Sequence, residues 1–352
     1  MVGCTKHSCD DPRKRFPNAV RNSARHQQMR IAFLLFLLAG TVCARAGDVV
    51  ELLPRTQLYG RDYVRITDWA KAKKLELHWM TRDRELRATN ATSKLYFTMD
   101  SRFATFNGIR LVLSCPVILQ KEKIYISVVD LQATVHPILY PEKMQAGTFI
   151  KTICLDAGHG GKDPGKLDGK NHEKRYTLLL AEEVERGLKE AGFKVVQTRT
   201  RDLWLDLPDR AKIANKEAAD LFVSLHYNAA GNVHARGTEV YCLTPAGTTS
   251  SNADRGHPAA PVFTGSSQSA KSVLLAYQLQ KSLVMNLNVE DRGVKRAQFL
   301  VLTEATMPAI LIEAGFMTNP TEANRIYDSA YRKKMARAIV GGILNYKKVV
   351  EQ

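Results

Sequence analysis

The chain has few cysteines and no paired arrangement of them. Six occur in 352 residues, none in a C-x-x-C pair, and only Cys115, Cys154 and Cys242 lie beyond residue 46. Three is an odd number, so a complete disulfide framework is excluded for this part of the chain. We expect these three residues to be buried free thiols that pack as small hydrophobic side chains.

Acidic residues are too few to balance the basic ones. The formal net charge is +16, and residues 1–46 carry +6 of it through eight Lys/Arg and two Asp. A basic surface favours polyanions such as nucleic acid, anionic membrane or an acidic cell-wall polymer. Because the sequence has no base-reading motif and no aromatic-rich basic platform, nucleic acid is not expected as a partner.

Long apolar runs are absent except for one near the N-terminus. Met29-Arg30 leads into IAFLLFLLAGTVC, followed by Ala44-Arg45-Ala46. A basic start, a short apolar run and an A-x-A site are typical of a secretory signal peptide. We predict that residues 1–46 are an N-terminal extension and signal peptide, with Met29 a candidate start. Export to the periplasm, cell envelope or exterior would follow, with no stable membrane span after cleavage. An uncleaved membrane anchor is the alternative, although the run is short for a bilayer.

Residues 47–147 are predicted to form a small α+β accessory domain. Two similar segments, YVRITDWA (63–70) and YISVVDLQ (125–132), each indicate a strand that turns into a short helix. Between them lie runs of alternating polarity, and Asn107-Gly108 is typical of a two-residue hairpin turn. The region has no cluster of His, Cys or carboxylates, so we interpret it as a binding or spacer domain.

Residues 148–352 alternate between predicted strands and predicted helices. Helices are expected over 173–191, 208–218 and 267–288 and from about residue 330, because apolar residues recur there at helical spacing. This alternation favours a three-layer α/β domain. The expected strands are FIKTICLD, FKVVQT, ADLFVSLH, GTEVYCL, AQFLVL and PAILIEAGF.

Candidate metal ligands and proton-transfer groups follow three of these strands. His159 comes after the first strand, His226 ends the third, and Glu313 follows Ile-Leu-Ile in the sixth. Ligands of open α/β sheets sit beyond the carboxyl ends of the strands. Glu173, at the start of the first helix, faces the same edge. Two His and one Glu make the ligand set of a hydrolytic zinc site, and a further Glu is a candidate general base.

The motifs of this region occur in the order of a known family. The chain resembles the zinc-dependent N-acetylmuramoyl-L-alanine amidases of the amidase_3 family over essentially all of residues 150–350. Residues 47–147 resemble, more weakly, the copper amine oxidase N-terminal-like domain of bacterial surface proteins, which implies no copper. The motifs that carry the main resemblance are LDAGHGGKDPG, NHEKRYTLLLA, VVQTR, LPDRAKIAN, DLFVSLHYNA, RGTEVY, DRGVKRAQFLVL and MPAILIEAGFMTN.

The resemblance implies a fold, a cofactor and roles for individual residues. It implies a twisted six-stranded mixed sheet flanked by helices, with Zn²⁺ held by His159, Glu173 and His226 and with Glu313 as the catalytic glutamate. The substrate implied is peptidoglycan, cleaved at the amide between N-acetylmuramic acid and L-alanine. Asn228 and Arg296 are candidate substrate contacts. His172 adjoins Glu173, but on a helix the two point about 100° apart, so His172 is not expected to bind the same ion.

One segment raises the question of regulation. In some members of the family an inserted helix covers the zinc until an activator protein displaces it. Residues 245–269 occupy the corresponding place, but they contain three prolines and one acidic residue, Asp254. A stable helix is therefore not expected there. We predict a mobile loop beside the site, and whether an activator protein acts on this chain stays open.

Two other functions remain compatible with the residues. A zinc peptidase acting on stem peptides would use the same ligands. A non-catalytic wall-binding protein is the second alternative, and the presence of Glu313 argues against it.

Overall fold

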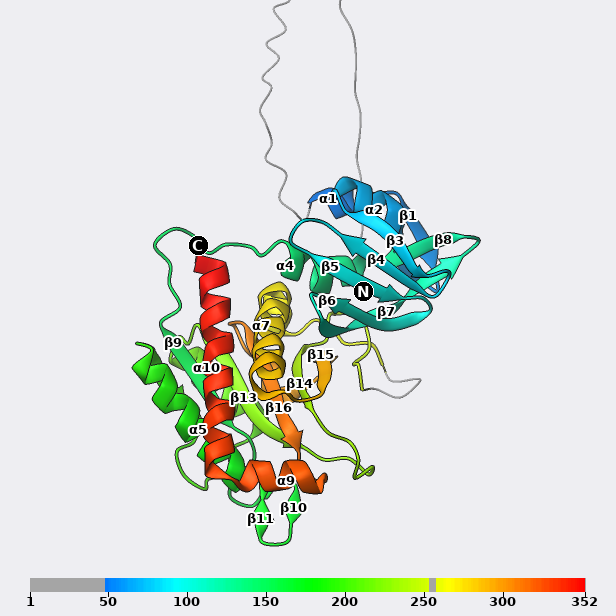
Figure 1. Ribbon diagram of the computed structural model, residues 1–352. Coiled ribbons are helices and arrows are strands. Elements are labelled where there is room, and N and C mark those ends of the chain that lie inside the picture. The colour runs from blue at the N-terminus through cyan, green and yellow to red at the C-terminus, as the bar shows by residue number, and fades with distance from the viewer. Residues whose placement is uncertain (1–47, 253–257, 352) are drawn as a thin grey trace, which may run out of the picture. The chain divides into compact units, whose positions relative to one another are not determined.

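A computed structural model describes residues 48–252 and 258–351 of the chain (Figure 1). The predicted signal peptide, with Met29, and the acidic residue Asp254 lie outside the described residues. The described residues belong to one compact unit.

The N-terminal region is built around the two similar segments. Strand β2 (Arg61–Arg65) runs into helix α2 (Ile66–Ala72), and β8 (Lys123–Ser127) runs into the short helix α3 (Val128–Asp130). β2 and β8 pair antiparallel, so the two segments lie side by side. Both therefore form the predicted strand and helix. The remaining elements are α1 (Asp48–Glu51), β1 (Arg55–Leu58), β3 (Glu76–Thr81), β4 (Glu85–Thr89), a π-helix (Leu131–Val135) and α4 (His136–Leu139).

The runs of alternating polarity form the other strands of this region. β5 (Lys94–Thr98), β6 (Ser101–Phe106) and β7 (Ile109–Gln120) pair antiparallel in sequence order. Asn107 and Gly108 connect β6 and β7 with φ values of 45° and 84°. Two successive positive φ values are what the favoured two-residue hairpin turn requires, which confirms the predicted turn.

The second half of the chain forms a six-stranded mixed sheet, as predicted. The strand order is β12-β9-β13-β16-β14-β15. The first four strands are parallel to one another, β14 runs antiparallel to β16, and β15 runs parallel to β14. The strands are β9 (Thr152–Ala157), β12 (Lys194–Gln197), β13 (Leu221–Asn228), β14 (Thr238–Leu243), β15 (Asp291–Ala297) and β16 (Ala309–Phe316).

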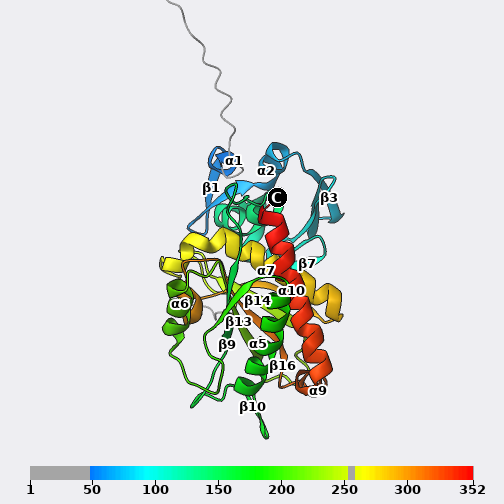
Figure 2. The same ribbon diagram turned by 90° about the vertical axis from the view of Figure 1, so that its left-hand side faces the viewer.

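Helices cover both faces of this sheet. α5 (Glu173–Glu190), α7 (Ser269–Leu287) and α10 (Ser329–Glu351) lie on one face, and α6 (Leu207–Lys216) lies on the other (Figure 2). Successive side chains of a strand point to opposite faces of the sheet, and in β13 both sets are apolar. Val223 and Leu225 pack with the first group of helices, and Phe222 packs with α6. Smaller elements are the hairpin β10 (Leu167–Asp168) and β11 (Asn171–His172), a 3₁₀ turn (Thr264–Gln268) and α9 (Pro320–Tyr327).

One predicted strand is wrong. The apolar run AQFLVL was expected as the fifth strand, but the strand is β15, which ends at Ala297. Residues 300–303 form helix α8 (Leu300–Thr303), and its Val301 and Leu302 pack in the same core cluster as Phe222. The apolar run thus serves helix packing, whereas the strand itself is the more polar stretch DRGVKRA.

The sheet does not stop at β15. Val294 of β15 pairs with Leu111 of β7, and the Arg110 amide donates to the Asp291 carboxylate at 2.7 Å. The connecting residues 141–151 have no regular structure, and Ile150 bonds to Glu351 near the end of α10. One hydrophobic cluster contains side chains from both parts of the chain. The division at residues 147 and 148 therefore stays a prediction from the sequence.

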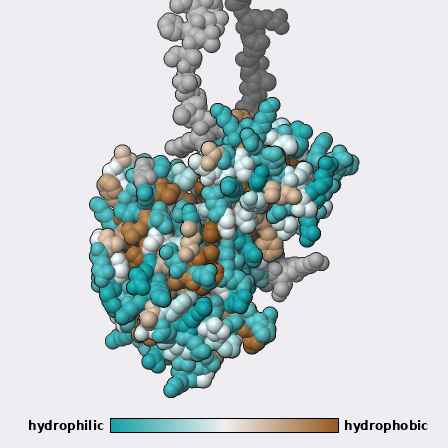
Figure 3. Space-filling model, in the orientation of Figure 1, coloured by the Kyte–Doolittle hydropathy of each residue, from teal (hydrophilic) through white to brown (hydrophobic). Residues whose placement is uncertain are grey.

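The described surface is mostly hydrophilic in the view of Figure 3, with hydrophobic patches in the region of α7 and α10. Within the ranges that the structure describes, no helix is both long enough and apolar enough to cross a bilayer. Cys115, Cys154 and Cys242 are buried free thiols, which confirms the expectation for them.

Candidate metal centre

Parallel strands bring the predicted site residues to one edge of the sheet. β9, β13 and β16 are neighbours and point the same way, so the loop after β9 and the ends of β13 and β16 meet at the same edge. His226 and Glu313 are directly opposite each other in the β13–β16 ladder. Glu173 is the first residue of α5, whose N-terminus lies at this edge.

His159, Glu173 and His226 converge on one point. Glu173 Oε1 lies 3.0 Å from His159 Nε2 and 3.2 Å from His226 Nδ1. One ligand atom from each of the three residues lies within 4.8 Å of the other two. In the described part of the chain this is the one such group of His, Cys, Asp or Glu, and His172 is outside it.

Hydrogen bonds fix the orientation of these side chains. Asp163 Oδ2 lies 2.8 Å from His159 Nδ1, which leaves Nε2 of the ring directed at Glu173. The amides of Tyr227 and Lys166 donate to the two oxygens of Glu173 at 3.0 and 2.9 Å. Metal-bound histidines usually have such a partner on the second ring nitrogen, because it sets the tautomer and the ring orientation.

Glycine is required at two positions beside this cluster. A Cβ on Gly158 would collide with the His226 ring, and a Cβ on Gly165 would collide with Glu173 and His159. His159 itself has a φ of 62°, a left-handed conformation that most residues avoid. Because Gly158 and Gly165 have no side chains, the two imidazoles and the carboxylate can approach one another closely.

The pKa values of the cluster reflect its crowding. Burial works against the charged forms of His159 and Glu173, but their mutual hydrogen bond and opposite charges outweigh it. The pKa of His159 is therefore raised and that of Glu173 is lowered. An ionised carboxylate and imidazole nitrogens directed at one point are the donor set that zinc prefers, so the residues fit this metal.

Glu313 differs from the other carboxylates of the site. Its Oε2 is buried and has no hydrogen-bond partner. Burial, together with the negative charges of Glu173 and Glu239, raises the pKa of Glu313 well above its usual value, while Lys295 acts in the opposite direction. A buried polar atom without a partner is rare in native proteins and calls for a functional explanation.

The predicted substrate contacts have different outcomes. Asn228 lies at the end of β13, at the site edge, where its Nδ2 donates to Glu239 at 2.5 Å. Arg296 was expected at the rim and is not there. It is 1% exposed and lies opposite Cys242 in the β14–β15 ladder. Both strands run antiparallel to β16, so both residues lie toward the end of the sheet away from Glu313. Its guanidinium donates to Leu243, Ser269, Ala133 and Thr134.

The segment 245–269 was also expected beside the site, and this is wrong. It follows β14, which runs antiparallel to β16, so it begins at the opposite end of the sheet from Glu313. Its described residues bond to β15 and its flank, where Ser251 exchanges hydrogen bonds with Arg296 and Ser250 accepts from Gln298. Within 245–269, Thr264–Gln268 form the 3₁₀ turn and Ser269 begins α7, so the expectation of no helix holds only for the described residues before 264.

Sequence reasoning missed several residues that shape the site. Asp163 orients His159, and Glu239 lies opposite Glu313 in the β14–β16 ladder. Arg199 and Arg210 bond to the loop that carries His159. Each of these residues belongs to a motif that the sequence analysis quotes. The sequence alone does not indicate which residue of a motif faces the site. The motifs are LDAGHGGKDPG, RGTEVY, VVQTR and LPDRAKIAN.

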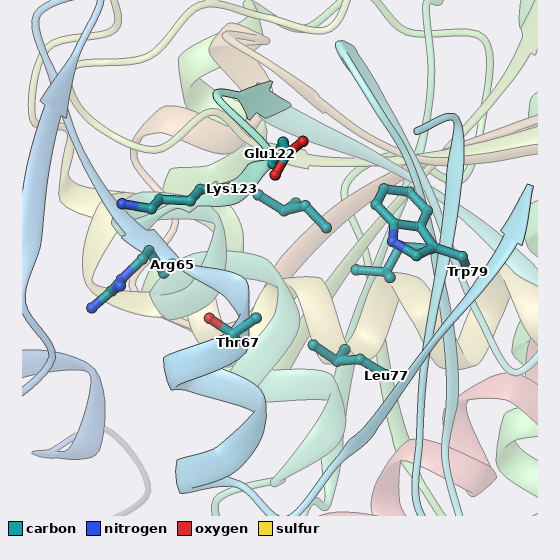
Figure 4. A pocket seen from close by; sticks show the side chains of 8 residues that line it. Arg65, Thr67, Leu77, Trp79, Glu122 and Lys123 are labelled. Atoms are coloured by element: carbon teal, nitrogen blue, oxygen red, sulfur yellow. The ribbon is translucent and has the colours of Figure 1, made fainter. Parts of the chain in front are cut away.

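A separate hollow lies in the N-terminal region (Figure 4). Its volume is about 250 Å³, and Arg65 and Lys123 extend away from Trp79 in this view. Its lining contains no His or Cys and one carboxylate, that of Glu122. The lining residues are Arg65, Thr67, Leu77, Trp79, Leu86, Glu122, Lys123 and Ile124.

Comparisons with known proteins give a consistent result. The pattern of the Amidase_3 family, described as N-acetylmuramoyl-L-alanine amidase, matches residues 153–345. The uncharacterized protein YqiI of Bacillus subtilis is 38% identical over 196 residues, which are 56% of this chain and 84% of that protein. The N-acetylmuramoyl-L-alanine amidase AmiA of Salmonella typhimurium is 32% identical over 220 residues, with 56% of this chain and 76% of AmiA covered.

Two further relatives each match a little over half of this chain. The amidase LytC of Bacillus subtilis is 33% identical over 196 residues, but these are 35% of LytC. The catalytic domain of the amidase CwlV from Bacillus (Paenibacillus) polymyxa is 33% identical with a TM-score of 0.48, over 56% of this chain and 99% of that domain. Residues before 153 lie outside the matched family pattern.

Proposed function

Since the chain belongs to the Amidase_3 family and is an N-acetylmuramoyl-L-alanine amidase acting on peptidoglycan, we propose that it is zinc-dependent and that His159, Glu173 and His226 hold the metal. The convergence of these residues, with ligand atoms within 4.8 Å of one another, supports this assignment. The lack of room for a Cβ at Gly158 and Gly165 supports it as well.

Glu313 is proposed as the catalytic base and acid. The reaction adds water across the amide between the lactyl carboxyl of N-acetylmuramic acid and the amino group of L-alanine. When bound, zinc would polarise the scissile carbonyl and make water a better nucleophile at neutral pH. Glu313 takes a proton as water attacks and returns a proton to the nitrogen as the carbon–nitrogen bond breaks. A raised pKa suits a carboxyl group that must both accept and donate.

Export and partners are part of the same proposal. The expected signal peptide would bring the enzyme to peptidoglycan, its proposed macromolecular substrate, in the periplasm, cell envelope or exterior. The segment 245–269 begins at the end of the sheet away from Glu313, so we propose an enzyme that works without displacement of a helical plug from this segment. Asn228 stays a candidate substrate contact because it lies at the site edge.

The observation that carries the proposal is the pairing of a three-residue ligand group with a partnerless buried carboxylate. The test is digestion of purified peptidoglycan with and without a chelator, followed by mass spectrometry of the new ends. We expect free lactyl carboxyl groups and free L-alanine amino groups, and we expect chelation to stop their release. Readdition of zinc should restore it.

The same experiment separates the alternatives. A zinc peptidase would release new ends within the stem peptide and leave the lactyl amide intact. A wall-binding protein without catalysis would bind the polymer and release nothing. Full release of lactyl ends by metal-free protein would overturn the zinc proposal.

A further inference from the structure

Two buried arginines gather the backbone carbonyls of the loop that carries His159. Arg199 Nε donates to Ala157 O and its Nη2 donates to Gly158 O, both at 2.8 Å. Arg210 Nη1 donates to Ala157 O at 2.9 Å and its Nη2 donates to His159 O at 2.8 Å. Three successive carbonyl oxygens therefore accept hydrogen bonds from two guanidinium groups, which are 3% and 2% exposed.

The arginines come from separate elements and are themselves held in place. Arg199 follows β12, and Arg210 lies in α6. Arg210 forms an ion pair with Asp156 at 2.8 Å, and Asp156 also accepts from the hydroxyls of Thr198 and Ser224. In the described part of the chain no carboxylate forms an ion pair with Arg199, whose guanidinium donates to backbone oxygens and to the Thr177 hydroxyl. The pair is thus built into the protein around the loop.

Burying two guanidinium groups side by side costs free energy. Burial, and then the neighbouring charge of Arg210, lowers the pKa of Arg199. Of the two arginines, Arg210 is paired with the buried Asp156 and Arg199 is not, and a buried charge is expensive unless it is paired or fully hydrogen-bonded. The carbonyl dipoles of the loop supply the hydrogen bonds that are otherwise missing.

The loop needs an external support of this kind. His159, Gly160 and Gly161 all have positive φ values, 62°, 127° and 56°, so their backbone continues neither strand nor helix. Glycine-rich chain is flexible, and glycine loses more conformational entropy on ordering than any other residue. If the metal had to order the loop, that entropic cost would weaken metal binding.

We infer that Arg199 and Arg210 are positioning residues that hold the His159 loop in its metal-binding conformation before the metal arrives. This inference rests on the proposed role of His159 as a ligand. A guanidinium suits the task because its donors form a rigid planar fork that reaches several acceptors at once. A lysine keeps the charge but offers one ammonium group and cannot hold successive carbonyls together.

Arg199→Lys in the full chain is the main test, because Arg199 lacks a carboxylate partner that the change would strand. Arg332→Lys is the matched control: Arg332 is also buried and donates to two backbone oxygens, those of Ile326 and Tyr327, which lie outside the loop. Zinc affinity is measured by competition with a chelator. Amide hydrogen exchange of residues 155–165 is measured on zinc-free and zinc-loaded protein.

The inference predicts a specific pattern. Zinc-free wild-type protein should protect the amides of Gly158, Gly160 and Gly161, which donate to Leu225, Asp163 and Asp202. Arg199→Lys should lose this protection without zinc, regain it with zinc, and bind zinc roughly 10–100-fold more weakly, the usual range for residues that support metal ligands. Arg332→Lys should leave both measurements unchanged.

Three results would overturn the inference. One is an unprotected loop in zinc-free wild-type protein. The second is an Arg199→Lys variant with unchanged exchange and zinc affinity, and the third is an equal loss of zinc affinity in Arg332→Lys. If Arg199→Lys does not fold, amide exchange in zinc-free wild-type protein and the same two measurements on Arg210→Lys still test the inference. If wild-type protein binds no zinc, the proposed function fails, whereas zinc-free exchange continues to test the arginines.

Discussion

Glu239 and Glu313 lie opposite each other on neighbouring strands, yet their surroundings differ sharply. Glu239 is 2% exposed and accepts hydrogen bonds from Arg292, Lys295, Asn228 and Tyr241. Glu313 has a buried oxygen with no partner and a raised pKa. The fold therefore satisfies one carboxylate completely and leaves an oxygen of its neighbour without a partner. This is the difference we expect between a structural glutamate and the proposed catalytic one.

Glu313→Gln should have the largest effect on the reaction. The amide keeps the size of the side chain but cannot take a proton, so turnover should fall on the order of 10²-fold or more. Zinc content should be unchanged, and the protein should be no less stable, because a buried carboxyl without a partner has been removed. Turnover, bound zinc and thermal unfolding are measured on one preparation. Turnover within a few-fold of wild type would end the assignment.

Glu239→Gln should affect the fold more than the chemistry. It leaves Lys295 and Arg292 without a balancing charge, and losing a charged hydrogen-bond partner costs about 1–3 kcal/mol. Denaturant unfolding gives the loss, and metal analysis should find zinc unchanged. A well-folded variant as inactive as Glu313→Gln would show that both glutamates take part in proton transfer.

Asn228→Ala should have a smaller effect and tests two roles at once. Loss of its hydrogen bond to Glu239 should lower the free energy of unfolding by about 1 kcal/mol. If Asn228 also contacts substrate, KM for peptidoglycan should rise while zinc content stays constant. An unchanged KM together with lower stability would restrict the residue to supporting Glu239.

Tyr241→Phe should have the smallest effect. It removes the hydroxyl that donates to Glu239 at 3.0 Å, and the other donors to that carboxylate remain. Unfolding free energy should fall by about 0.5–1.5 kcal/mol, and kcat and KM should stay at wild-type values. A large loss of activity here would mean that small movements of Glu239 reach Glu313.

The sequence indicated which residues meet at the candidate site, but it did not indicate the side chains that surround and support them. His159, His226 and Glu313 each follow a recognisable apolar strand, and parallel strands must end at the same edge, so their meeting could be anticipated. Glu239 sits in an equally apolar strand, but its role depends on Lys295 and Arg292 from β15, a strand that was placed wrongly. The wrong placement of β15 and the missed role of Glu239 are related, because cross-strand partners cannot be inferred without the strand register.

The failures at Arg296 and at residues 245–269 share another cause. Both predictions were made without knowing the directions of β14 and β15. The carboxyl ends of β9, β13 and β16 lie at the site edge, but β14 and β15 run the other way, and strand direction leaves no trace in local composition. The long helices, by contrast, were predicted well, because α5 and α7 show their buried faces in the spacing of their own residues.

The pairing of β7 with β15 bears on how the protein can be shortened. A version that begins near residue 148 would leave β15 as a bare sheet edge, with unpaired amides and carbonyls that invite strand addition and aggregation. It would also deprive Arg296 of Ala133 and Thr134, two acceptors of its buried guanidinium. The N-terminal region thus shields the edge of the catalytic sheet, whatever else it binds.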